Sequence, residues 1–249
     1  MRLSEKEKAS LREQFRNMRP AEKLQYVFTY YKWPILLGLM ALAIGISTAV
    51  HFAKKREPVL YLAAVNTAWG SELEEALTAG FLNTEGYDPR KHEVYEYPDL
   101  YLSDNPAEEN HAYAYASEMK LMAAINAAQM DLVIMNREAY DLLSGKGYLM
   151  DLQTLCAEEY PELYRALEPY VVENTVVLSD NTLEVTLGEA EEIQKVTEQA
   201  ANGMEVSGLP VFQSAEIDGK LYLGVVANSP RLPAVLAYLR YLIQSSVPD

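Results

Sequence analysis

Hydrophobic and polar positions divide the chain into a short first part and a long second part. Residues 33–53 form an apolar run that contains no Asp, Glu, Lys or Arg. A helix of this length reaches roughly 30 Å, which matches the hydrocarbon core of a bilayer. The pattern predicts an amphipathic basic arm over residues 1–32, a transmembrane signal anchor over 33–53, a linker over 54–57 and an extracytoplasmic domain over 58–249.

Charge predicts the orientation of these segments. Residues 1–57 carry 11 Lys or Arg and 5 Asp or Glu, whereas residues 58–249 carry 10 and 31, a net charge of −21. Because basic flanks stay in the cytoplasm, we expect a single-pass protein of the cell membrane with its N-terminus inside and its domain extracellular. So acidic a domain lacks the basic patch that nucleic acid requires. A cleaved signal peptide is the alternative, but the arm before the apolar run is far longer than a signal peptide's basic region.

The first half of the domain alternates between strand-like and helix-like patterns. Short apolar runs predict strands, and longer runs of helix formers predict helices between them. The predicted strands are 58–66, 94–97 and 131–135, and the predicted helices are 71–82, 106–129 and 138–143. Strands separated by helices are typical of right-handed βαβ units, so we expect an α/β fold with a mixed, mainly parallel sheet and flanking helices.

The second half changes character. Turn residues at Ser179-Asp180-Asn181 and at Asp218-Gly219 predict two hairpins. The first is expected to join strands 176–178 and 183–185, and the second to join 209–217 and 220–227. Helices are predicted over 159–170, 188–201 and 233–243, and Gly203 is well placed to end the second of them.

Two stretches resemble extracytoplasmic solute-binding proteins with the type 2 periplasmic-binding fold. The run Met130–Leu155 (MDLVIMNREAYDLLSGKGYLMDLQTL) is similar to a segment in which a strand leads to a short helix and the chain then passes along the cleft. The stretch Gly208–Ile243 resembles the end region of that family, where a strand near an Asn-Ser pair precedes a final helix. The resemblance implies a periplasmic-binding-like lobe, but about 50 residues separate the two stretches, fewer than the family's second lobe needs. The second lobe is either rudimentary or absent.

One ligand position follows from this fold, because open α/β sheets form their crevice at the carboxyl ends of the strands. There Trp69 offers a stacking face, and Arg137 could pair with a carboxylate. Two structural alternatives stay open: Trp69 tucked against the first helix, and Arg137 balancing nearby acidic residues. The residues predicted to bind a ligand are Asn66, Thr67, Trp69, Tyr97, Tyr101, Asn136, Arg137, Asn228 and Ser229.

Catalytic signatures are scarce. The three histidines (His51, His92 and His111) are not spaced as metal ligands, and no nucleophile or phosphate-loop motif occurs. The single cysteine, Cys156, has apolar neighbours that predict a buried thiol. We therefore expect no enzyme, no catalytic residue, no metal and no cofactor.

Two hypotheses from different classes remain. In the first, the domain binds a small organic ligand beside a bacterial permease or sensor in the membrane. In the second, it is a structural or interaction subunit of a membrane complex that uses the same scaffold without a ligand. The first predicts an open cleft, and the second a filled cleft together with an exposed apolar patch elsewhere.

Overall fold

The computed structural model describes residues 19, 33–48, 56–105, 111–156, 160–181, 186, 192–213, 217 and 219–244. The chain forms two compact units, Met1–Lys55 and Arg56–Asp249. In the first unit, residues 33–48 form a helix with exposed side chains. No helix within the described residues is both long and apolar enough to cross a bilayer. Residues 49–53 of the predicted anchor, and the predicted arm apart from Arg19, lie outside the described residues.

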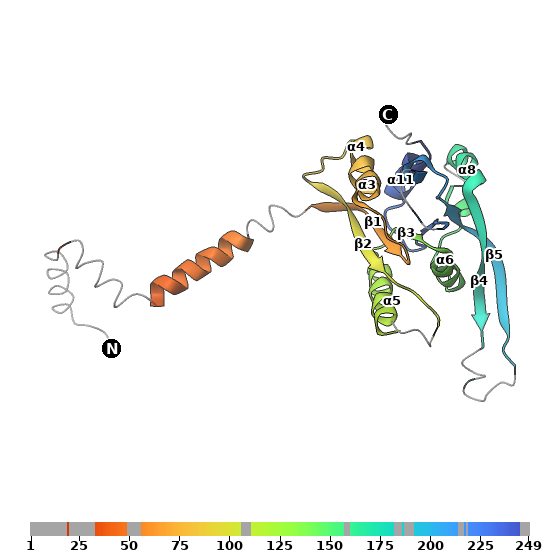
Figure 1. Cartoon of the computed structure of the whole chain (residues 1–249), viewed down its shortest axis with the longest axis horizontal. Coiled ribbons are helices and arrows are strands. Elements are labelled where there is room, and N and C mark those ends of the chain that lie inside the picture. The colour runs from red at the N-terminus through yellow and green to blue at the C-terminus, as the bar shows by residue number, and fades with distance from the viewer. Residues whose placement is uncertain are drawn as a thin grey trace. The chain divides into compact units, whose positions relative to one another are not determined.

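The second unit is built on one six-stranded sheet (Figure 1). In space the strands follow the order β2-β1-β3-β6-β5-β4. β2, β1 and β3 are parallel, whereas β3, β6, β5 and β4 pair antiparallel. The strands are β1 (Glu57–Val65), β2 (His92–Leu100), β3 (Leu132–Met135), β4 (Val171–Asp180), β5 (Lys195–Glu205) and β6 (Tyr222–Val225). The predicted mixed α/β sheet is confirmed, but only half of it is parallel.

Helices cover both faces of this sheet. β1 and β2 are joined by a continuous helical segment of three parts: α3 (Ser71–Glu75), the π-helical η1 (Ala76–Gly80) and α4 (Phe81–Thr84). α5 (His111–Asn126) joins β2 to β3, and α6 (Arg137–Gly145) follows β3. The remaining helices are α7 (Leu152–Cys156), α8 (Pro161–Leu167), the 3-10 turn η2 (Glu168–Tyr170), α10 (Pro210–Gln213) and α11 (Leu232–Gln244).

Alternation along the strands divides the core in two. Leu60 and Leu62 of β1 point to the side covered by α3, η1, α4 and α11, which we call the α3 face. Ala63 and Val65 point to the side covered by α5 and α6, which we call the α5 face. β1 and β3 are thus apolar on both faces, as strands buried between two helical layers must be.

Two tyrosines attach α11 to the π-helical turn. A π turn disturbs the regular pattern of helical hydrogen bonds and leaves carbonyls open to other donors. The hydroxyls of Tyr238 and Tyr241 donate to the carbonyls of Leu77 and Ala76, at 2.9 and 2.7 Å. Gly80 leaves room for this approach, because a Cβ at that position would lie 2.6 Å from the Tyr241 hydroxyl.

Two predictions for the second half are wrong. Residues 195–201, predicted as the end of a helix, begin β5, because pairing with β4 outweighs their helix-forming composition. The first strand expected at the Asp218-Gly219 turn is absent from the described residues of 209–217, where α10 lies, and β6 pairs with β3 and β5. Gly219 nevertheless has a φ of 86°, as a turn glycine does.

A buried polar network explains the glycine in β5. Tyr140 of α6 donates to the Val172 carbonyl and to the Asn202 side chain, both at 2.9 Å. A Cβ on Gly203 would lie within 2.6 Å of the Tyr140 ring. Gly203 was predicted to end a helix, whereas its observed role is to let α6 approach β5 closely.

Candidate functional site

A pocket of about 250 Å³ opens where β1 and β2 end. We call it the strand-end pocket. It is lined by Leu62, Ala64, Thr67, Ala68, Trp69, Glu74, Glu96, Tyr97, Pro98 and Asp99. The chain leaves β1 toward the α3 face and leaves β2 toward the α5 face, so the pocket lies where the connections diverge, the usual ligand position in such sheets. Three residues predicted from the sequence line it: Thr67, Trp69 and Tyr97.

Trp69 forms an apolar wall of the pocket. Its side chain is half-buried and packs against the core on the α3 face. Trp69 can therefore pack against the core, as the structural alternative expected, and at the same time form a wall of the pocket. An indole held in this way presents a flat face whose π electrons attract cations.

Two carboxylates, those of Glu74 and Glu96, line the strand-end pocket. Glu96 follows the buried Val94 by two positions on β2, so its side chain lies on the α3 face, and Glu74 stands on α3. Burial, and secondarily the negative charge of Glu74, raises the pKa of Glu96 from 4.5 to about 7. Within the described part of the chain neither side chain has an ion pair. The pocket thus holds uncompensated negative charge near neutral pH.

The backbone around this pocket is unusual. Asn66 and Asp99 have φ values of 52° and 57°, in the left-handed region where Asn and Asp are the commonest non-glycine residues. The Asn66 amide donates to the Leu102 carbonyl at 2.6 Å and accepts from the Leu102 N–H at 2.7 Å. The Tyr113 hydroxyl donates to the Asp99 carbonyl. Asn66, predicted to contact a ligand, thus uses its side chain to hold the segment after β2.

Tyr97 and Tyr101 lie in aromatic clusters. The Tyr97 ring contacts Tyr61 and Tyr95, with ring centroids 6.3 and 5.1 Å apart, and Lys120 lies 5.6 Å above it. Tyr97 packs mainly against the core on the α5 face, although it also borders the pocket. Tyr101 stacks on Tyr113 at 6.4 Å.

Arg137 and Asn136 lie on the α5 face, apart from Trp69. Asn136 caps α6 by accepting from the Ala139 N–H at 3.0 Å. The Arg137 guanidinium pairs with Asp141 at 2.9 Å and lies 5.6 Å from the Tyr222 ring. The hydrogen bond with Asp141 raises the pKa of Arg137 above its ordinary value. The expected convergence of Trp69 and Arg137 on one ligand is therefore wrong, because Trp69 packs on the α3 face whereas Arg137 begins α6 and lies over Tyr140 on the α5 face.

Asn228 and Ser229 lie at the other end of the parallel strands, where β3 begins. β6 is antiparallel to β3, with Leu132 opposite Val225, so the residues after β6 adjoin the start of β3. Asn228 donates to the Ile125 carbonyl at 2.7 Å, and Ser229 donates to the Asp131 carboxylate at 2.5 Å. These two residues therefore cannot line the strand-end pocket. They would lie there only if the last strand ran parallel to β3, whereas β6 runs antiparallel to it.

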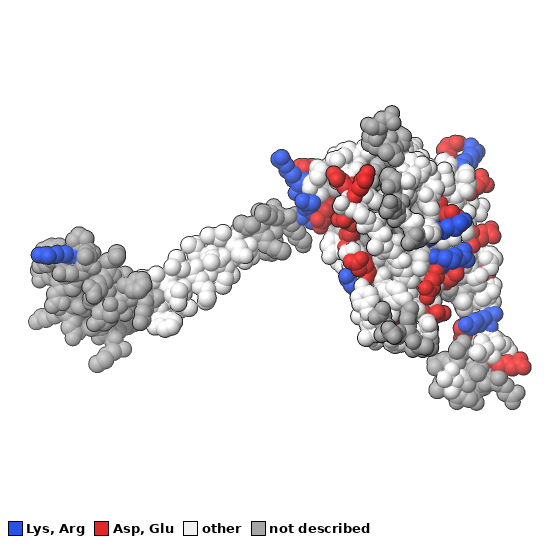
Figure 2. All heavy atoms as spheres, in the orientation of Figure 1, with Lys and Arg blue, Asp and Glu red and all other residues white. Residues whose placement is uncertain are grey.

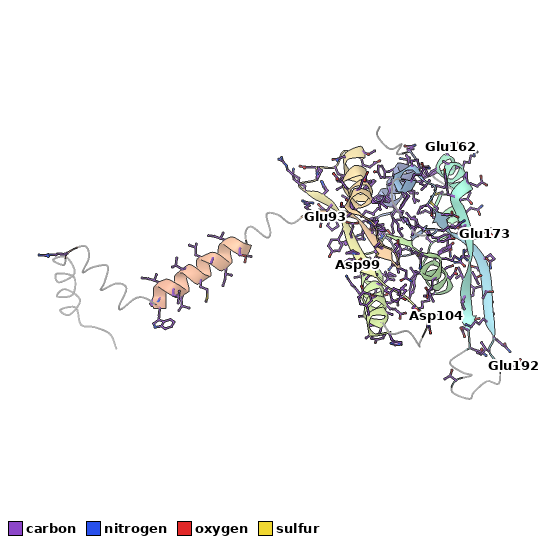
Figure 3. The ribbon with its side chains drawn as sticks, viewed as in Figure 1. Glu93, Asp99, Asp104, Glu162, Glu173 and Glu192 are labelled. Atoms are coloured by element: carbon purple, nitrogen blue, oxygen red, sulfur yellow. The ribbon has the colours of Figure 1, made fainter. Side chains whose placement is uncertain are left out.

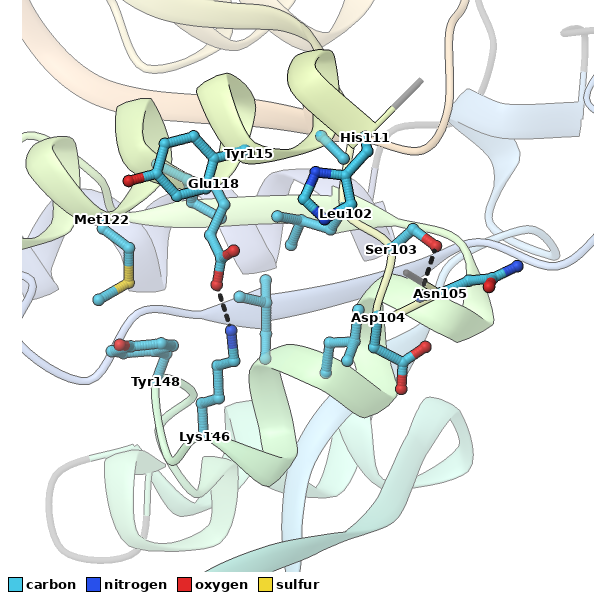
Figure 4. Close-up of a pocket in the computed structure, with 14 residues that line it drawn as sticks. Leu102, Ser103, Asp104, Asn105, His111, Tyr115, Glu118, Met122, Lys146 and Tyr148 are labelled. Carbon is cyan, nitrogen blue, oxygen red and sulfur yellow. Dashed lines mark hydrogen bonds and ion pairs between the residues drawn. The ribbon is translucent and has the colours of Figure 1, made fainter. Parts of the chain in front are cut away.

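A second cavity, of about 260 Å³, lies between α5, α6 and the segment after β2 (Figure 4). We call it the helix-side cavity. Its floor is apolar, with Leu102, Leu121 and Leu143 among its lining residues. An ion pair between Lys146 and Glu118 crosses its middle, as the dashed line in Figure 4 shows. A ligand would have to replace this pair, so the helix-side cavity is the weaker candidate.

Comparisons with known proteins do not decide between these sites. No protein-family model matches the chain, and no curated protein matches it. Among solved structures, a full-length OxyR variant from Pseudomonas aeruginosa is similar, with 14% sequence identity and a TM-score of 0.27. The overlap covers 83% of this chain and 81% of that one. A likeness at this level carries no argument, so the site is argued from its own geometry.

Sequence reasoning did not single out Glu74 and Glu96. A signal for Glu96 was present: it lies two positions after Val94 in a predicted strand, so it shares the face of a buried residue. With 31 acidic residues in the domain, that periodicity was the only feature that separated Glu96 from the solvated carboxylates. Figure 3 labels several acidic residues at the periphery of the domain, among them Glu93 and Asp104.

Proposed function

We propose that the domain is a small-ligand-binding module and that its ligand occupies the strand-end pocket. The observation that carries the proposal is the half-buried carboxylate of Glu96, which shares the pocket with Trp69 and has no ion pair with any described residue. Buried carboxylates are usually paired, because an uncompensated charge away from water is costly. A ligand that brings a positive charge would supply the missing partner.

The chemistry of the pocket favours a small organic cation, such as a protonated amine. Its ammonium group would form charge-assisted hydrogen bonds with Glu96 and Glu74, and its carbon skeleton or charge would lie against the Trp69 indole. A volume of about 250 Å³ suits a ligand of a few heavy atoms rather than a polymer. The earlier expectation of a carboxylate ligand at Arg137 is replaced, because that guanidinium is already paired.

The setting of this module is also a proposal. The apolar run and the basic arm support a domain held outside the cell membrane, beside a permease or sensor that responds to the loaded pocket. The likeness of Met130–Leu155 to solute-binding proteins supports the same role. Within the described residues, no group of three or more His, Cys, Asp or Glu could hold a metal.

Fluorescence and melting temperature together test the proposal. The chain has two tryptophans, so Trp33→Phe leaves Trp69 as the reporter in the full chain. We expect propylammonium, tetramethylammonium or 1,4-diaminobutane to shift the Trp69 emission and to raise Tm, since a ligand that binds the folded state stabilises it. Acetate and butanol are the anionic and uncharged controls.

Variants define the site further. Glu96→Gln should weaken cation binding about tenfold or more, the loss expected for one charge-assisted contact, whereas Arg137→Ala should leave it unchanged. Affinity should rise as the pH passes through about 7, because the cation binds the ionised form of Glu96. If none of the three cations shifts either signal, the alternative of an interaction subunit without a ligand takes its place.

A further inference from the structure

The hairpin of β4 and β5 continues beyond the rest of the sheet. β5 pairs with β6 at only two positions, Met204 with Leu223 and Glu205 with Tyr222. The remainder of β5 pairs with β4 alone, as far as Lys195 opposite Asp180. Figure 1 shows the two strands running on past α6. We call residues 176–181 and 192–199 the distal ribbon.

Helix α6 covers only the near part of β4. The Tyr140 and Ser144 hydroxyls donate to the carbonyls of Val172 and Thr175, at 2.9 and 3.0 Å. β4 is the last strand of the sheet on this side, so within the described residues no further strand pairs with it. From Val176 to Asp180 it has no such cover from α6, and it contains neither the proline nor the lysine that usually blocks an edge strand.

Apolar side chains of the distal ribbon face solvent. Leu178, Ile193 and Val196 are 57%, 58% and 56% exposed. Val176 and Leu178 are two positions apart on β4, and Val196 lies opposite Ser179 next to them. A two-stranded ribbon with exposed apolar residues gains little stability by itself, which favours a partner that covers it.

Charge indicates which partner fits. The distal ribbon carries three acidic residues (Asp180, Glu192 and Glu198) and one lysine, a net charge of −2. That lysine, Lys195, is already paired with Asp180 at 3.1 Å. Glu173 and Glu192 lie along this hairpin in Figure 3, and Figure 2 shows further acidic side chains on the visible face of the domain. A second copy would bring the same negative charge, so the complementary occupant is a basic segment.

We propose that the free edge of β4 in the distal ribbon is a docking site for an extended, basic segment of a partner protein, added as a seventh strand. Backbone hydrogen bonds would supply the pairing, and alternate apolar side chains of the partner would cover Leu178 and Val196. Lysines or arginines between them would lie on the other face of the ribbon, toward Asp180. This inference does not depend on the strand-end pocket.

A synthetic octapeptide of alternating valine and lysine tests the docking site. Hydrogen exchange of the full chain is followed by mass spectrometry, with an octapeptide of alternating valine and glutamate as the matched control. We expect the valine–lysine peptide to slow exchange of residues 176–180 roughly fivefold or more, because added strand hydrogen bonds protect edge amides. β2, the opposite edge strand, should not change, nor should the control peptide have an effect.

Two variants separate docking from damage to the fold. Leu178→Lys places a cation on the exposed ribbon and should abolish the protection, and Val196→Lys should do the same from the neighbouring strand. Met119→Lys, at a 52% exposed position of α5, should leave it intact. Absence of protection, or equal protection by both peptides, would overturn the proposal. If exchange of residues 176–180 is slow without peptide and slows further as the chain concentration rises, the β4 edge pairs with a second copy of the chain instead, and the proposal is overturned.

Discussion

Arg231 and Asp131 form an ion pair at the start of β3, with Nε and Oδ2 2.7 Å apart. Asp131 is fully buried and also accepts from the Tyr61 N–H at 2.8 Å and from the Ser229 hydroxyl. The guanidinium lies 4.5 Å from the Tyr61 ring and donates to the Ala128 carbonyl. One carboxylate thus joins β1, β3 and the segment that leads into α11.

Removing the cation should therefore be costly. We expect Arg231→Met to lower the free energy of unfolding by about 3 kcal/mol, because it leaves a buried carboxylate without its counter-charge. Lys120→Met is the control: it removes an exposed cation from the Tyr97 ring and should cost about 0.5–1 kcal/mol. Urea unfolding of the full chain measures both. Equal losses for the two variants would mean that the buried pair contributes no more than a surface contact.

Gly80 and Tyr241 should be energetically coupled. We expect Gly80→Ala to destabilise by about 1 kcal/mol net, since the clash with the Tyr241 hydroxyl exceeds the gain in helix propensity. In the double variant Gly80→Ala with Tyr241→Phe that hydroxyl is gone, and the nearest remaining ring atom is 3.7 Å away. The double variant should be at least as stable as Gly80→Ala alone, as a double-mutant cycle by thermal unfolding would show. Additive losses would argue against the steric explanation.

Glu96 should make the domain less stable at alkaline pH. Its pKa is about 7 when folded and near 4.5 when unfolded, so the folded state holds an extra proton between these values. The stability contributed by that proton is complete below pH 4.5 and is lost as the pH rises through 7. Glu96→Gln should therefore gain stability relative to the natural chain between pH 5 and 8, on the order of 1 kcal/mol after allowance for solvent screening. Glu75→Gln, at an exposed position of α3, should not change this pH dependence.

The predicted orientation can be measured on intact cells. External protease should digest the domain beyond residue 58 and spare the basic arm, because the arm is expected in the cytoplasm. An epitope at each end of the chain, followed by immunoblotting before and after lysis, distinguishes the two ends. Digestion of the arm in intact cells would reverse the orientation, and a mature chain starting near Val50 would show that the anchor is removed.

The sequence predicted the parallel half of the sheet well, because β1 and β3 are short apolar runs and helical patterns separate the three strands. It failed for β5, where helix formers such as Lys195, Glu198 and Ala200 pair with the preceding strand β4. Trp69 and Thr67 line the strand-end pocket, where the strand-end rule put them from local information alone, and their contact with a ligand stays a prediction. Asn228 and Ser229 were misplaced because the direction of β6 depends on its partners β3 and β5. Glu96 was missed because its burial depends on η1 and α4, which pack against β2.

The central position of β6 sets an order of assembly. Residues 222–225 come late in the chain, yet they separate β3 from β5 in the finished sheet. Until they emerge from the ribosome, the two halves of the sheet have nothing between them to pair with, and each presents an open edge. A chain stalled before Tyr222 would expose the edges of β3 and β5 together, the condition under which strands recruit neighbouring molecules.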